Sequence, residues 1–461
     1  MNEHQSGTGR RRLGDPLQRF IKLFSSGSAL LMMATAIAVV WANLDHESYH
    51  HFWHSPFGLS SEMFNVNMGL MHWVNDGLMA VFFFVVGLEI KREFLAGELS
   101  SFKQASLPIF AAIGGMLVPI LLYFLFGFEG DAQKGWGIPM ATDIAFSLGV
   151  LAILGKRVPL ALKVFLTALA IVDDLGAVLV IALFYGGDLN WTYLLIAAGL
   201  MLVLTVANLR DVQNLKVYTL LGCVIWYLFL QSGVDGPGTG LHATIAGVLI
   251  AFTIPMRPKV HINEFLARIK SALTRFNSVP KSENKRVLTD DQLYAINEVS
   301  YCVKKVQSPL QFIEHQFHGF ISMFVLPVFA LANAGVTLVH QGEGSGEVFT
   351  TLSLAIAFSL VVGKGIGITF FSWLAVRTGI AVKPRKSSWT SFFGLALLGG
   401  IGFTMSIFIA SLGFKGQPDL LNQAKLGIFI GSIISGLLGF YLLKYSLKKD
   451  EQQQPVTTRN D

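Results

Sequence analysis

The ionisable residues that stand out in this sequence lie within stretches that are otherwise apolar: Asp76, Glu89, Asp143, Asp173, Asp174 and Lys364. Asp173 and Asp174 are adjacent, near the middle of the apolar stretch 160–185. Two carboxylates this close in a medium of low dielectric constant cannot both ionise at low cost. Such a pair takes up either protons or a cation, and competition between the two is the elementary chemistry of cation/proton exchange.

Lys364 is the only basic residue in the middle of an apolar stretch. A buried ammonium group needs a carboxylate to balance its charge, and one of the two adjacent aspartates is the expected partner. For any single member of this set, the alternative is an ion pair that only holds helices together. That alternative weighs most for Asp76 and for Glu89, which lies beside Lys91 and Arg92.

Two of the apolar stretches are interrupted by helix-breaking residues. The first break reads IPMATD at residues 138–143, and the second reads GGIGFT at residues 399–404. Proline and glycine leave backbone groups without helical partners, which lipid does not tolerate unless those groups line a polar cavity. Interrupted segments at corresponding places of two halves indicate broken helices that cross at an ion site in the membrane midplane. The first break carries Thr142 and Asp143.

The composition shows which elements must position these residues. Hydrophobic residues make up 52% of the 461 and charged residues 14%, and the mean hydropathy is +0.56. A soluble chain has about 25% charged residues, so this chain has too few charges to cover several soluble domains. Its two cysteines, Cys223 and Cys302, have no metal-binding or disulfide spacing. We therefore expect an all-α polytopic membrane protein and exclude nucleic-acid-binding, disordered and disulfide-rich classes.

Stretches of about 17–25 apolar residues are long enough to span a membrane as helices. They predict about twelve transmembrane helices, and the two breaks predict inverted repeats. The expected ranges are 28–43, 67–90, 105–128, 132–154, 160–185, 191–209, 215–231, 240–255, 315–338, 351–376, 389–413 and 420–443. Twelve spans leave all but four of the 35 lysine and arginine residues on the side that holds both termini. By the positive-inside rule, both termini are expected to be cytoplasmic.

These spans divide the chain into three parts. We expect residues 1–27 to be a cytoplasmic segment with an amphipathic helix, residues 28–443 the transmembrane domain, and residues 444–461 a cytoplasmic tail. Within the domain, residues 256–314 are a long cytoplasmic loop with two amphipathic helical patterns. Asn263 is expected to cap the first helix, and Thr289 the second through a capping box with Gln292. The two helices are expected to lie against the membrane face, and a regulatory or partner-binding role is the alternative.

The stretches around these residues resemble the NhaA-type sodium/proton antiporters of bacterial inner membranes. The matching segments are Asn75–Glu93, Ala141–Leu175, Asn333–Val336 and Gly400–Leu412. The resemblance extends from about residue 17 to 445, and it implies a secondary transporter that is not an enzyme and needs no cofactor. Residues 55–66 stand where the family has a dimerising hairpin, so a homodimer is implied, with an ordinary extracytoplasmic loop as the alternative.

The resemblance also implies roles for single residues. Asp174 is similar to the principal Na⁺ ligand, with Asp143 and Thr142 nearby. Asp173 is similar to the partner of Lys364, and it would carry protons. Six further residues match positions that are linked to the pH response of the family: Glu89, Glu93, Glu314, His315, His318 and His242. Solvated residues at helix ends are the alternative for the histidines.

The function implied by the resemblance is export of Na⁺ and Li⁺ in exchange for a larger number of H⁺, for sodium and pH homeostasis. Such exchange would be electrogenic and regulated by pH, in the inner membrane and among membrane lipids. A sodium-coupled symporter on a related fold is the alternative. An intramembrane aspartyl protease is disfavoured because the sequence has no Gly-x-Gly-Asp signature. A cation channel would need a continuous pore, and broken helices with a buried lysine argue against it.

Overall fold

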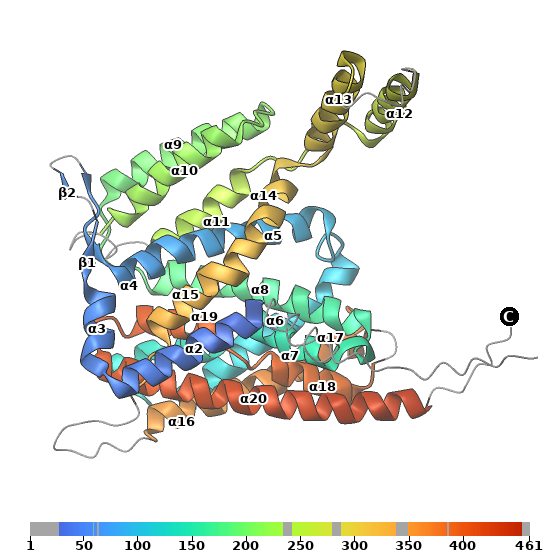
Figure 1. The fold of residues 1–461 in the computed structure, drawn as a ribbon. Coiled ribbons are helices and arrows are strands. Elements are labelled where there is room, and N and C mark those ends of the chain that lie inside the picture. Colours follow the sequence, from blue (N-terminus) through green and yellow to red (C-terminus); the bar gives the residue numbers. More distant parts are fainter. Residues whose placement is uncertain are drawn as a thin grey trace, which may run out of the picture. The chain divides into compact units, whose positions relative to one another are not determined.

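The computed structural model describes residues 27–58, 60–61, 64–233, 242–278, 287–337, 349–384 and 387–453. Most of them are helical (Figure 1), because lipid offers no partner to an open backbone group and a helix pairs these groups within itself. The expected all-α membrane protein is thereby confirmed. The predicted amphipathic helix before residue 27 and the last part of the predicted C-terminal tail lie outside the described residues.

Helices stand at all twelve predicted ranges. Nine helical runs among the described residues are long and apolar enough to cross a membrane, and the bent pair Trp389–Leu398 and Phe403–Gly413 makes a tenth. The remaining two helices, Leu215–Leu230 and Ala243–Thr253, are apolar but shorter.

The contacts divide the chain into two compact units. One consists of Met1–Leu78, Ser101–Ile181 and Gly319–Asp461, and the other of Met79–Ser100 and Ala182–His318. In the second unit the helices are α5 (Met79–Ala96), α9 (Trp191–Leu209), α10 (Leu215–Leu230), α11 (Ala243–Thr253), α12 (Ile262–Ser278), α13 (Asp290–Val306) and most of α14 (Pro309–Phe320).

The first unit holds the remaining elements, among which η marks 3-10 and π segments. They are α2 (Gly27–Leu44), α3 (His46–His54), α4 (Leu70–His72), η1 (Trp73–Leu78), α6 (Phe102–Leu125), η2 (Gly130–Met140), α7 (Ile144–Leu154), η3 (Gly155–Arg157), most of α8 (Leu160–Phe184), η4 (Ile321–Val325), α15 (Leu326–Asn333), α16 (Thr351–Phe358), η5 (Ser359–Gly363), α17 (Lys364–Arg377), α18 (Trp389–Leu398), α19 (Phe403–Gly413) and α20 (Pro418–Gln453). Its four short strands form two antiparallel pairs: β1 (Pro56–Phe57) with β4 (Met68–Gly69), and β2 (Ser60–Ser61) with β3 (Phe64–Asn65). A β-ribbon therefore stands where the sequence predicted a hairpin.

Both predicted breaks are present. At the first, the 3-10 helix η2 ends at Met140, the chain is not helical over residues 141–143, and α7 begins at Ile144. At the second, α18 ends at Leu398 and α19 begins at Phe403, with a bend of 46° between them. Glycine is needed there, because a Cβ on Gly400 would lie 2.5 Å from both the Leu360 carbonyl oxygen and Ser435 Oγ.

The helix that carries Lys364 is held close to α6. A Cβ on Gly367 of α17 would overlap the Gly114 carbonyl oxygen of α6, and one on Gly363 would lie 2.7 Å from Pro119 Cα. Such small residues let two helix backbones approach closely within a membrane. The π segment η5 ends immediately before Lys364. Single π turns of this kind are frequent at functional sites.

The loop of residues 256–314 contains the two predicted amphipathic helices, α12 and α13. The capping box of Thr289 and Gln292 at the start of α13 is confirmed. The prediction that Asn263 caps α12 is wrong. The Phe265 amide donates to the His261 carbonyl at 2.9 Å, so the helical hydrogen bonds begin before Asn263, which lies inside the first turn.

Candidate functional site

Lys364 and Asp173 form a fully buried ion pair within the first unit. Lys364 Nζ lies 2.5 Å from Asp173 Oδ2, and neither side chain is exposed. The Thr142 hydroxyl accepts a hydrogen bond from Lys364 Nζ at 2.9 Å and lies 2.6 Å from Asp173 Oδ2, to which it can donate. Desolvating two charges is costly, and additional hydrogen bonds of this kind are what make a buried pair tolerable. Three of the five residues predicted for the ion site are therefore in direct contact.

Asp143 joins the starts of two helices. Its Oδ1 accepts from the Phe146 amide at 3.0 Å, and its Oδ2 accepts from the Thr404 amide at 3.0 Å and the Thr404 hydroxyl at 2.5 Å. The carboxylate thus caps α7 and α19 at once, where the helix dipoles place partial positive charge. A cation bound by Asp143 would share these oxygens with the two caps.

Further hydrogen bonds tie the two breaks together. Carbonyl groups that the second break leaves open accept from residues of the first, and one carbonyl of the first accepts from α19. The bonds are Asp143 amide to Ile401 carbonyl at 2.6 Å, Ser147 hydroxyl to Leu398 carbonyl at 2.9 Å, and Ser406 hydroxyl to Ile138 carbonyl at 2.8 Å. The Gly399 carbonyl lies 2.8 Å from the Thr142 hydroxyl and is the alternative to Asp173 as the acceptor of its one hydrogen. Backbone groups that the two breaks leave without helical partners therefore find hydrogen bonds within the protein, where lipid offers none.

Asp174 follows Asp173 on α8, and each is only 1% exposed. Consecutive residues of an α-helix leave the axis about 100° apart, so the two carboxylates point in different directions. Asp173 is the one that makes the ion pair with Lys364. Its second oxygen, Oδ1, is buried without a hydrogen-bond partner among the described residues. A buried acceptor in that state can take a proton or a cation.

The cluster has the chemistry that competition between a cation and a proton requires. Carboxylate, hydroxyl and carbonyl oxygens are the ligands that hard cations prefer. Three buried carboxylates and one buried ammonium group leave net negative charge in a medium of low dielectric constant. Such a site must acquire positive charge, either as a metal cation or as protons.

In the second unit, Arg92 bridges two of the predicted pH-response residues. Its guanidinium lies 2.9 Å from Glu93 Oε1 and 3.0 Å from Glu314 Oε1. Glu93 also accepts from the Glu98 amide at 2.9 Å through Oε2. Glu89 lies one helical turn before Glu93 on α5 and is half-buried. The structure therefore brings Glu93 and Glu314 together and places Glu89 on the same helix.

The three predicted histidines have different surroundings. His315 and His318 on α14 are exposed. His242 is buried at the start of α11, where its Nε2 lies 2.7 Å from the Tyr185 carbonyl oxygen.

Two residues of these clusters were not among the predicted site residues. Thr404, in the second break, is the direct partner of Asp143. It is the first polar residue after the glycines of the break, which is the signal that could have identified it as a residue at a helix start. The second is Arg92, which pairs with both Glu93 and Glu314.

Comparison with known proteins gives the same family name in a family model and in three relatives. The family model described as Na⁺/H⁺ antiporter 1 matches residues 18–443. A relative named Na(+)/H(+) antiporter NhaA 1, from Saccharophagus degradans, is 46% identical over 431 residues, which cover 93% of this chain and 91% of the relative. Na(+)/H(+) antiporter NhaA 2 from Syntrophotalea carbinolica is 46% identical over 94% of this chain and 96% of its own length. Na(+)/H(+) antiporter NhaA from Oleidesulfovibrio alaskensis is 45% identical over 95% of this chain and 96% of its own length.

Proposed function

The chain belongs to the Na⁺/H⁺ antiporter 1 family, and from that membership we propose that it exchanges Na⁺ for H⁺ at the cluster of Asp143, Thr142, Asp173, Asp174 and Lys364. It is a secondary transporter and not an enzyme. The observation that carries the site is the buried Asp173–Lys364 pair beside Asp174, at the junction of two broken segments. The named relatives are antiporters, so they give the symporter alternative no support.

The exchange follows from charge balance at the cluster. In the cation-free form, protons reside on Asp173, Asp174 or Lys364. Na⁺ binds at Asp174, with Thr142 and Asp143 nearby, and its positive charge displaces these protons. Rocking of one helical bundle against another then exposes the site to the two sides of the membrane in turn.

The first test uses the purified full-length protein in proteoliposomes that contain a pH-sensitive dye. Addition of Na⁺ or Li⁺ is expected to drive proton movement, whereas K⁺ is not. If more protons than Na⁺ ions are exchanged, an imposed membrane potential will change the rate, because each net charge moved is worth about 2.3 kcal/mol per 100 mV. Proton movement that ignores Na⁺ would contradict the exchange, and a rate that ignores the potential would contradict the stoichiometry alone.

The carboxylates around Arg92 are proposed to set the pH response, and Glu314→Gln tests this. The substitution removes one of the two carboxylates that share the Arg92 guanidinium, so less negative charge gathers around Arg92 as the pH rises. We expect the activation midpoint to move to lower pH by roughly half a unit, which corresponds to a partly exposed pair worth about 0.5–1 kcal/mol. Maximal exchange should stay within about twofold of the wild type, because the ion cluster is unchanged.

The control for this pH profile is Glu264→Gln, since Glu264 also pairs with an arginine, Arg268, but lies on the exposed helix α12. It should leave the midpoint where it is. An unchanged midpoint in Glu314→Gln as well would remove the acidic residues around Arg92 from the pH response.

The assembly and orientation are also proposed. A homodimer through the β-ribbon of β1 to β4 is expected in the inner membrane, with cytoplasmic termini. A cysteine placed at residue 461 that reacts with an impermeant reagent in everted vesicles, but not in intact cells, would establish the orientation. Mass measurement of the protein in lipid, with and without residues 56–69, would show whether the ribbon joins two copies.

A further inference from the structure

Helices α12 and α13 form an antiparallel hairpin within the second unit. The amides of Lys259 and Val260, just before α12, donate to the Lys305 carbonyl near the end of α13, at 3.0 and 3.2 Å. At the other end of the hairpin, the Arg275 guanidinium stacks 4.9 Å from the centre of the Tyr294 ring. Figure 1 shows the two helices side by side.

The residues that face the partner helix recur at helical spacing in both members. Ala272 on α12 is 1% exposed, and Ala295 and Cys302 on α13 are 2% and 0% exposed. In each helix a large apolar residue follows the facing residue and stays exposed. Leu273 follows Ala272, and Ile296 and Val303 follow the two buried residues of α13. Leu266, seven residues before Leu273, continues the row on α12.

Both rows lie on the same side of the hairpin. A residue one position after the facing residue is turned about 100° in the right-handed sense around its own axis. Because the axes of α12 and α13 are antiparallel, the same turn leads to the same side. The rows combine into one apolar face with exposed fractions of 59% for Leu266, 55% for Leu273, 44% for Ile296 and 41% for Val303.

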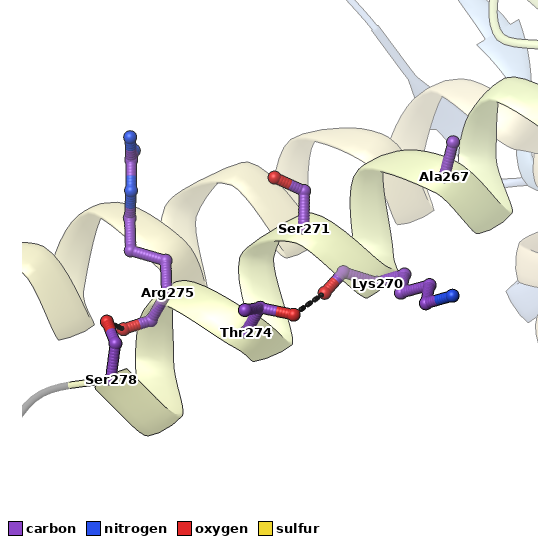
Figure 2. A pocket seen from close by; sticks show the side chains of 6 residues that line it. All are labelled: Ala267, Lys270, Ser271, Thr274, Arg275 and Ser278. Carbon is purple, nitrogen blue, oxygen red and sulfur yellow. Dashed lines mark hydrogen bonds between the residues drawn. The ribbon is translucent and has the colours of Figure 1, made fainter.

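The opposite side carries charged residues and two exposed tyrosines instead of an aliphatic row. Glu264, Arg275, Tyr294 and Tyr301 each come one position before a residue that packs towards the partner helix, and the Arg275–Tyr294 contact shows that these positions share a side. Figure 2 shows a hollow along α12 whose lining is free of large apolar residues: Ala267, Lys270, Ser271, Thr274, Arg275 and Ser278. The Thr274 and Ser278 hydroxyls donate to carbonyls of α12 itself. The hollow therefore lies on the surface of α12 alone, from Lys270, which borders the apolar row, to Arg275 on the opposite side.

The hairpin is attached to membrane helices at both ends. Helix α14 begins at Pro309, with two residues between it and the end of α13, and opens an apolar run that is long enough to cross the membrane. The chain enters from α11, and the Leu310 amide donates to the Pro255 carbonyl at 3.2 Å, so entry and exit are adjacent. A 17-residue helix is about 26 Å long, and the hairpin therefore stays within that distance of the bilayer.

We propose that the apolar face of the α12–α13 hairpin rests in the anionic interface of the bilayer that this chain spans. Exposed apolar patches of this kind mark contact surfaces, and amphipathic helices bury such a face at the boundary of headgroups and acyl chains. The positive charge that borders this face favours anionic over neutral lipid. Lys270 is exposed beside the row, four residues after Leu266 and three before Leu273. The acidic residues Glu264 and Glu298 each come one position before a residue that packs towards the partner helix, so they lie on the opposite side from the row.

The test places a fluorescent probe on the full-length protein in nanodiscs that hold one copy each. In a Cys223→Ser/Cys302→Ala background, the probe NBD is attached at Leu273→Cys or, as a matched control on the polar side, at Tyr301→Cys. Lipids that carry a nitroxide on the upper acyl chain serve as the quencher. In discs with phosphatidylglycerol, we expect emission at position 273 to be quenched roughly twofold or more relative to position 301.

A second variant tests the role of charge. Lys270→Glu should weaken the quenching at position 273 in discs with phosphatidylglycerol and leave it unchanged in discs of phosphatidylcholine alone. Equal quenching at positions 273 and 301 would overturn the proposal. So would a probe at 273 that is shielded from iodide without being quenched by lipid, since another part of the chain would then cover the face. Shielding that requires two copies in a disc would assign the face to a second copy and likewise overturn it.

Discussion

Replacing Asp174 with asparagine is expected to abolish Na⁺-driven proton movement at every pH, whereas Asp173→Asn should retain measurable Na⁺ binding. Asp173 already shares its charge with Lys364 at 2.5 Å, while Asp174 is proposed to bind the cation. At an effective dielectric constant of about 20, a unit-charge contact at about 4 Å is worth about 4 kcal/mol. Its loss would weaken Na⁺ binding by roughly a thousandfold.

The measurement combines dye-reported exchange in everted vesicles with calorimetric Na⁺ titration of the purified variants. Asp188→Asn is the matched control, since this exposed aspartate follows the same helix, α8, and should behave as wild type. Near-normal exchange in both Asp173→Asn and Asp174→Asn would refute the assigned site. Loss of binding in both would show that the two aspartates act as one ligand.

The second large effect concerns Lys364→Met. Removing the ammonium leaves the Asp173 carboxylate buried without its partner, and breaking such a pair costs about 3–5 kcal/mol. We expect the Tm of the protein in detergent to fall by roughly 5–10 °C. The loss should be larger at pH 8 than at pH 6, because folding then requires Asp173 to take up a proton. The double variant Asp173→Asn/Lys364→Met should recover most of the Tm, since no charge is left unpaired.

A second buried lysine provides the control. Lys425 on α20 is 7% exposed and donates to the Gly335 carbonyl at 3.3 Å, but it makes no ion pair among the described residues. Lys425→Met should therefore change the Tm much less than Lys364→Met. If both variants melt like the wild type, or if the double variant melts no higher than Lys364→Met, the ion pair does not stabilise the protein as argued.

The helices were predictable because their signals are local. A run of apolar residues is visible in a single window of sequence, and lipid enforces helical structure on it. Glycines and a proline likewise marked both breaks at residues 138–143 and 399–404. The same windows could not show that η2 is a 3-10 helix or that π segments precede Lys364 and contain Asp76, since these depend on packing against other helices.

The partners of the site residues were only partly predictable. One of the adjacent aspartates was expected to pair with Lys364, and the structure shows that Asp173 does so. The hydrogen bonds that Thr404 donates to Asp143, and the bridge of Arg92 to Glu314, join residues that are 261 and 222 apart. A contact across that distance leaves no periodic pattern in one sequence. The predicted cap at Asn263 was wrong for a local reason. Helix α12 begins two residues earlier than such a cap requires, which is within the usual error of predicted helix boundaries.

The hydrogen bonds between the two breaks can form only late in the synthesis of the chain. Asp143 is synthesised 261 residues before Thr404, whose amide and hydroxyl it needs. At about 5–20 residues per second, the interval lasts roughly 13 to 52 s. Throughout it, the first break lies in the membrane or the insertion machinery without the carbonyl and hydroxyl groups that later satisfy it. Until the penultimate span is made, we expect these groups to be satisfied by water or by the insertion machinery, and a chain that ends before residue 399 would lack their final partners.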